Sequence, residues 1–74
     1  MIDIFINSEY IKLDQFLKFS NIIGAGGEAR NFLMGNKIIV NDEPENRRGK
    51  KLRNGDIIKI RNEEYRIVQN GETK

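Results

Sequence analysis

The spacing of apolar residues changes near the amino end of the chain, and this change limits the available folds more than any other feature. Ile2, Ile4 and Ile6 alternate along the sequence, as in a strand with one buried face. After a break at residues 7–9, the apolar spacing becomes that of one face of a helix, with Leu13, Phe16, Leu17 and Ser20 at positions i, i+3, i+4 and i+7. We therefore expect a strand over residues 1–6 and then a helix with one buried face.

A glycine-rich break and a second, shorter helix are predicted next. Residues 24–27 read Gly-Ala-Gly-Gly and interrupt the helical pattern. The buried face of the second helix is expected to hold Ala29, Phe32 and Leu33. Gly35-Asn36 predicts the end of this helix, because both residues tolerate positive φ. The glycines leave the first N–H groups of the helix unshielded, so this end either receives an anion or forms a plain turn between helices.

The second half of the chain predicts strands. Residues 37–40 read as a strand that a turn at residues 41–42 ends. Residues 57–60 and 65–68 predict an antiparallel hairpin, with residues 61–64 as its connection. The expected fold class is α+β, with two short helices packed on one side of a small, mostly antiparallel sheet. With 74 residues the chain buries only one thin core, so we expect a single domain over residues 1–74.

Basic side chains are concentrated in residues 46–53, Asn-Arg-Arg-Gly-Lys-Lys-Leu-Arg, which we call the basic segment. It contains no acid and lies between two predicted turns, so we expect a solvated loop. The net charge of the chain is only +2, so any attraction to a polyanion depends on this local concentration. Lys and Arg neutralise phosphates and release counterions, which suits a nucleic-acid backbone. A charged loop that only keeps the domain soluble is the alternative.

Residue types exclude most catalytic sites. The chain has no cysteine and no histidine, which removes disulfides, thiolate metal sites and histidine-dependent catalysis. Residues 24–27 lack the Lys-Ser/Thr of a phosphate-binding loop. We expect no enzyme activity, no metal, no cofactor and no small-molecule substrate. The sequence also shows no membrane span and no leader, so a cytoplasmic protein without a membrane partner is expected.

Several motifs resemble one known family. Residues 12–18, Lys-Leu-Asp-Gln-Phe-Leu-Lys, resemble the first helix of the αL RNA-binding motif, first described in ribosomal small-subunit protein S-four. Its later signatures resemble residues 29–30, 38–42 and 55–58. The motifs of its stand-alone YaaA-type bacterial subfamily are similar to residues 15–18, 26–30, 40–43 and 47–52. The resemblance implies an S-four-like fold that binds structured RNA, with ribosomal RNA or a ribosomal particle as the expected partner.

Three positions, in two parts of the sequence, depart from the family pattern. Many members place Ser-Arg ahead of the second helix, where this chain has Ala25 and Gly26. The second helix therefore lacks a serine cap, and the basic segment has to supply more of the RNA contact. Lys12 stands where family members often have Arg, which keeps the charge but loses bidentate geometry toward phosphate.

The resemblance and the charge pattern together predict a basic face, provided that the helices and the basic segment converge. Its expected RNA-binding residues are Lys12, Lys18, Arg30, Arg47, Arg48, Lys50, Lys51 and Arg53. Among the aromatic residues, we expect Phe5, Phe16 and Phe32 in the core, and packing is also favoured for Tyr10, Phe19 and Tyr65. Backbone recognition of folded RNA is therefore favoured over base stacking. An adaptor for an acidic protein surface and a non-specific DNA binder are the alternatives.

Overall fold

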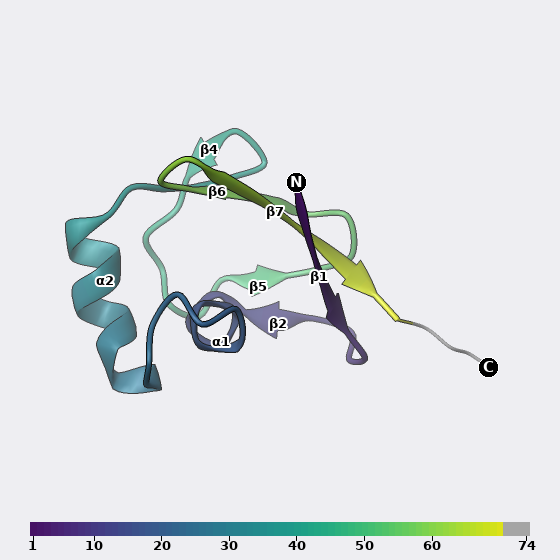
Figure 1. Cartoon of the computed structure of the whole chain (residues 1–74), viewed down its shortest axis with the longest axis horizontal. Coiled ribbons are helices and arrows are strands. Elements are labelled where there is room, and N and C mark those ends of the chain that lie inside the picture. The colour runs from purple at the N-terminus through teal and green to yellow at the C-terminus, as the bar shows by residue number, and fades with distance from the viewer. Residues whose placement is uncertain (71–74) are drawn as a thin grey trace.

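The computed structural model describes residues 1–70, which form a five-stranded sheet, a two-stranded ribbon and two helices (Figure 1). The sheet holds β1 (Ile2–Ile6), β3 (Ile38–Val40), β4 (Glu43–Pro44), β6 (Ile57–Ile60) and β7 (Glu63–Gln69). The ribbon pairs β2 (Ile11–Lys12) with β5 (Lys51–Leu52). The helices are α1 (Leu13–Phe19) and α2 (Ala29–Gly35), and the 3₁₀ turn η1 (Gly26–Glu28) precedes α2. The predicted α+β fold class is confirmed.

The sheet has the strand order β1-β7-β6-β3-β4 and is mostly antiparallel. Only β1 and β7 run parallel, with Ile4 opposite Ile67. The β6–β7 hairpin is tighter than predicted, because Glu63 already pairs with Ile60. Its turn is Arg61-Asn62, and Arg61 adopts a φ of 58°, a left-handed conformation typical of tight hairpin turns. The predicted connection at residues 61–64 was therefore too long.

Helix α1 forms where its periodicity predicts. Leu13, Phe16 and Leu17 are fully buried, and together they form the face that α1 turns toward the core. The helix ends at Phe19, and the hydroxyl of the next residue, Ser20, donates a 2.7 Å hydrogen bond to the carbonyl of Phe16. The backbone N–H of Ser20 donates to the same carbonyl at 2.9 Å, so the hydroxyl adds a second bond at the end of the helix.

Helix α2 ends at Gly35 as predicted, but its end is stabilised in a different way from the prediction. No side chain caps its start, as expected from Ala25, but the Glu28 carboxylate accepts a 3.1 Å bond from the Gly24 N–H. Asn36 has a φ of −136°, so the end of α2 does not use positive φ. Instead, the Asn36 side-chain amide donates a 3.0 Å bond to the carbonyl of Phe32, which occupies a free helix-end acceptor.

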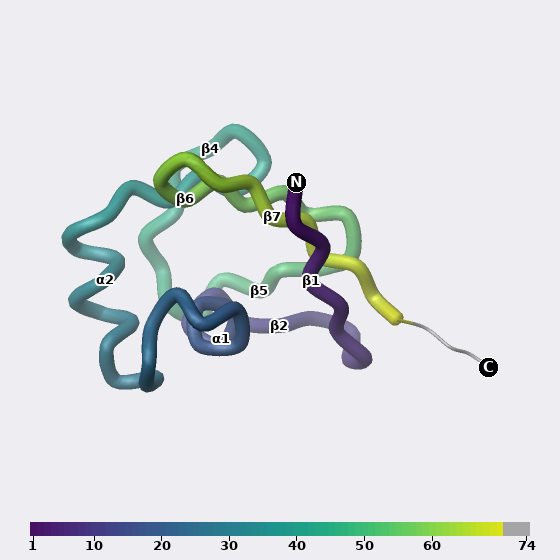
Figure 2. Tube along the Cα trace, viewed as in Figure 1, coloured from purple at the N-terminus to yellow at the C-terminus, as the bar shows by residue number. Residues whose placement is uncertain are grey.

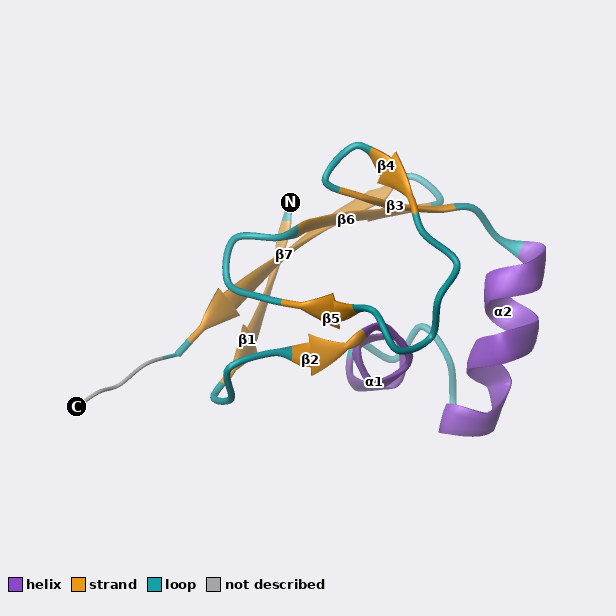
Figure 3. Ribbon diagram, turned by 180° about the vertical axis from the view of Figure 1, so that it is seen from behind, coloured by secondary structure: helices purple, strands orange, loops and turns teal. Residues whose placement is uncertain are grey.

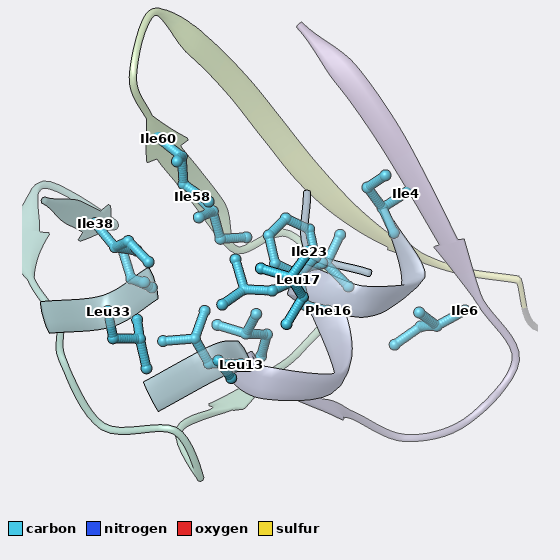
Figure 4. Packing of buried hydrophobic residues seen from close by; sticks show 14 residues of the cluster. Ile4, Ile6, Leu13, Phe16, Leu17, Ile23, Leu33, Ile38, Ile58 and Ile60 are labelled. Atoms are coloured by element: carbon cyan, nitrogen blue, oxygen red, sulfur yellow. The ribbon is translucent and has the colours of Figure 1, made fainter. Parts of the chain in front are cut away.

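The core lies between the inner face of the sheet and the two helices (Figure 4). Strands β1, β3, β6 and β7 contribute Ile4, Ile6, Ile38, Val40, Ile58, Ile60 and Ile67. The Phe16 ring meets the Tyr65 ring edge-on with centroids 5.4 Å apart. Helix α1 is therefore the central element of the core, and its position fixes the position of any chain segment that is hydrogen-bonded to it.

Candidate nucleic-acid interface

The basic segment is bonded to the start of α1 rather than free in solution. The N–H of Leu13 donates to the carbonyl of Lys50 at 2.8 Å, and the N–H of Asp14 donates to the carbonyl of Arg48 at 3.0 Å. Leu52 is fully buried opposite Ile11. Seen from behind, the chain leaves β4, passes α1 and enters β5 (Figure 3). The expectation of a solvated loop was therefore wrong for its backbone, because the segment caps the otherwise unpaired N–H groups of α1.

The β2–β5 ribbon presents cations on its exposed face. Lys12 and Lys51 lie opposite each other across the ribbon. Like charges at opposed positions destabilise a pair of strands, so a bound anion would relieve this repulsion. The Lys51 ammonium lies 4.9 Å and the Arg53 guanidinium 5.4 Å from the ring centroid of Tyr10. The ring orients both cations toward one surface, although Arg53 also lies 3.7 Å from the Glu9 carboxylate.

Helix α2 and the basic segment meet at a hollow of about 400 Å³. Arg30 lines it from α2 and Arg48 lines it from the segment, and both residues are exposed. Met34, which is 78% exposed, supplies an apolar wall, and Asn46 supplies an amide. No acid lines this hollow, so its two guanidinium groups face solvent without compensation from its walls. The structure thus brings the second helix and the segment together, as the predicted face requires.

Arg47 differs from the other cations of the basic segment because an acid neutralises it locally. Its Nε lies 2.9 Å from Glu45 Oε2 and its second guanidinium nitrogen lies 3.1 Å from Glu45 Oε1. The Glu45 side chain is only 11% exposed, whereas that of Arg47 is 71% exposed. The bidentate bond from Arg47 is the largest cause that lowers the pKa of Glu45 from 4.5 to about 2. The Arg47 charge is therefore less available to a ligand than sequence alone indicates.

This ion pair predicts an acid-sensitive contribution to stability. A carboxylate whose pKa is lowered by folding stabilises the fold above its ordinary pKa, and that contribution is lost as the pH falls from 4.5 toward 2. In Arg47→Ala the pKa of Glu45 should return to its ordinary range, and Arg47→Lys should give an intermediate value because lysine cannot form the two parallel bonds. An NMR titration of the Glu45 carboxyl carbon measures both. A pKa that stays near 2 in Arg47→Ala would contradict this assignment.

Most of the chain matches one known protein family. The profile of the S4 domain matches residues 4–68. The chain belongs to the S4 domain family. A relative from Bacillus subtilis (strain 168), the probable ribosome maturation protein RlbA, is 51% identical over 55 residues, which cover 74% of this chain and 78% of that protein. No solved structure matches the chain. The family resemblance seen in the sequence motifs is confirmed.

Besides Arg47, which is paired with Glu45, the predicted site residues of this S4 domain lie in four places. Arg30 and Arg48 line the shared hollow, and the exposed face of the ribbon holds Lys12, Lys51 and Arg53. Lys50 is half-buried beside α1 and accepts a bond from Leu13 through its carbonyl. Lys18 is exposed on α1 but lines none of the hollows found among residues 1–70. The structure therefore groups Arg30 with Arg48, and Lys12 with Lys51 and Arg53, while Lys18 belongs to neither group.

Aromatic residues include the clearest errors of the sequence analysis. Phe5, expected in the core, is 56% exposed on the outer face of the sheet opposite Val68. The alternation that buries Ile4 and Ile6 already places Phe5 on the other face. Phe32 is only half-buried, whereas Phe16 is in the core as expected. The sequence analysis did not place Tyr10 in the site. Tyr10 and Lys12 are two residues apart, and this spacing could have indicated that both side chains lie on the same face of a strand.

The described residues contain neither a cluster of metal ligands nor a membrane-spanning helix. No three acidic side chains among residues 1–70 gather closely enough to hold a metal ion. None of the helices in this range is long and apolar enough to cross a membrane.

Proposed function

We propose that this S4 domain protein binds structured RNA without catalysing a reaction, and that its target is ribosomal RNA or a ribosomal particle in the cytoplasm. The observation that carries the proposal is the convergence of Arg30 and Arg48 at one hollow. The name of the Bacillus relative, probable ribosome maturation protein RlbA, supports the choice of target. The absence of histidine and cysteine from the sequence supports a binding role over catalysis.

The proposed mechanism is docking of a preformed cationic surface on an RNA backbone. The carbonyls of Arg48 and Lys50 are hydrogen-bonded to α1, whose buried face lies in the core. Little backbone freedom is therefore lost on binding, which favours affinity. The backbone of the basic segment is thus held against α1, which limits the spacings of phosphates that its cations can reach. Folded RNA is recognised mainly through such shape and backbone contacts, because side chains cannot read its deep major groove.

A titration with matched nucleic acids tests this proposal. The ligands are an RNA hairpin with a stem of about 16 base pairs, the span typical of duplex-RNA binding domains, and a DNA duplex of the same length. We expect tighter binding to the RNA, and a slope of log affinity against log salt of roughly −3 to −4 for about four phosphate contacts. Equal affinity for both ligands would favour a non-specific DNA binder. Binding to neither, by folded protein, would favour an adaptor for an acidic protein.

A further inference from the structure

Three surface hollows adjoin one another around the carboxyl end of α2. The hollow of Arg30 and Arg48 shares Leu33 and Asn46 with a second hollow beside β3 and β4. The second hollow shares Asn36 and Lys37 with a third, of about 370 Å³, which reaches the outer face of the sheet. We call these three hollows together the α2 groove. The trace shows α2 at one end of the molecule, joined to the sheet by the short connection that carries Lys37 (Figure 2).

The third hollow is lined by three cations and by no acid. Lys37 precedes β3, Lys59 lies on β6, and Arg61 lies in the β6–β7 turn. The Lys59 ammonium is partly compensated, at 3.5 Å from the Glu64 carboxylate and 3.9 Å from that of Asp42. Neither Lys37 nor Arg61 forms an ion pair with any carboxylate of residues 1–70. These two residues therefore supply most of the available positive charge in this hollow.

Arg61 is held in place before any ligand binds. Its guanidinium carbon lies 5.1 Å from the centroid of the Phe32 ring. Stacking on an aromatic ring orients a guanidinium and leaves its N–H donors free for an oxyanion. This contact gives the half-buried Phe32 a second role besides core packing, because its exposed part supports a cation. A positioned arginine loses less freedom on binding phosphate than a mobile one does.

The middle of the α2 groove does not repel an anion. Glu45 is the one acid that lines the second hollow, and both of its carboxylate oxygens are bonded to Arg47. Its charge is therefore compensated within the protein. Cations stand at both ends of the groove, with Arg30 and Arg48 at one end and Lys37 and Arg61 at the other. A ligand that matches this distribution is an extended polyanion with regularly spaced charges, such as a nucleic-acid strand.

We propose that Lys37 and Arg61, assisted by Lys59, form a second phosphate-binding site, which an RNA strand engaged at Arg30 and Arg48 reaches along the α2 groove. This inference rests on the proposed function and extends its footprint from the basic segment to the opposite end of α2. It assigns a role to cations that lie outside every motif of the sequence.

The test compares the salt dependence of binding in matched variants, with the RNA hairpin described above as the probe. Two phosphate contacts beyond the four of the proposed function bring the expected wild-type slope to about −5. Lys37→Ala with Arg61→Ala should reduce the magnitude of this slope by about 2 and weaken binding several-fold, because two phosphate contacts are lost. The charge-conserving pair Lys37→Arg with Arg61→Lys should keep the wild-type slope. Thermal melting of each variant shows that the fold is retained.

The outcomes separate this inference from the proposed function. A wild-type slope in the Lys37→Ala, Arg61→Ala variant overturns the second site, and if Arg30→Ala with Arg48→Ala still lowers the slope, the proposed function stands. A lowered slope in both double variants supports the continuous path. If the wild-type protein does not bind the hairpin at all, the proposed function fails and the second site fails with it.

Discussion

Replacement of Arg30, Arg48 and Lys51 by alanine is expected to remove most of the affinity for RNA while the protein stays folded. All three side chains are exposed, and the carbonyl of Arg48 that bonds to α1 is unaffected by the change. Substitutions at such surface positions usually change stability by no more than about 0.5 kcal/mol each. Each lost phosphate contact should lower the salt slope by about 0.9, so the triple variant should lose nearly 3 of the 3 to 4 expected without the second site of Lys37 and Arg61. Titration with the RNA hairpin and a thermal melt measure the two effects.

The matched control for this triple variant is Glu45→Gln combined with Arg47→Gln. That pair removes a cation of the basic segment but leaves the net charge unchanged, because the two groups already neutralise each other. We expect it to retain nearly all of the RNA affinity. A large fall in melting temperature for the triple variant would show that these side chains support the fold, and an equal loss of affinity in the control would show that Arg47 contacts RNA directly.

Leu17→Ala is expected to have the largest effect on stability. Leu17 is fully buried at the centre of the core, and a leucine-to-alanine change at such a site costs roughly 2–5 kcal/mol. That loss is comparable to the whole stability of a small domain, which lies near 5–15 kcal/mol. The variant should therefore unfold at a much lower urea concentration than the wild-type protein, or be unfolded without urea.

Phe32→Ala provides the comparison for Leu17→Ala. Because Phe32 is only half-buried, it should cost less stability than the Leu17 change. Urea titration followed by circular dichroism measures both variants. An equal or larger loss for Phe32→Ala would mean that the contact between Phe32 and Arg61, or the packing of α2, contributes more to stability than the exposure of the ring indicates.

Local periodicity predicted the parts of the fold in which burial follows sequence spacing. Leu13, Phe16 and Leu17 are buried as predicted, because an α-helix repeats every 3.6 residues and shows one face to the core. The ribbon of β2 and β5 was missed, since strands of two residues are too short to show alternation. The parallel pairing of β1 with β7 joins the two ends of the described chain, and no local pattern encodes such a pairing.

The candidate site was predicted from charge and family motifs, and its errors arise from neighbours that are distant in the fold. Arg47 looked like an available cation because the basic segment itself contains no acid, but folding places Glu45 against it. Lys37 and Arg61 are isolated in the sequence and gather only because α2, β3 and the β6–β7 turn meet. Anchoring of the basic segment by α1 depends on backbone bonds, which side-chain patterns do not reveal.

The most direct measurement of the central claim is crosslinking of the protein to RNA in living cells, followed by sequencing of the bound RNA. The wild-type protein and the Arg30, Arg48, Lys51 alanine variant are expressed at equal levels. We predict that ribosomal RNA is enriched at defined positions with the wild-type protein and that this enrichment is lost with the variant. Recovery of no RNA above background with the wild-type protein, or equal recovery with both proteins, would contradict RNA binding through this face.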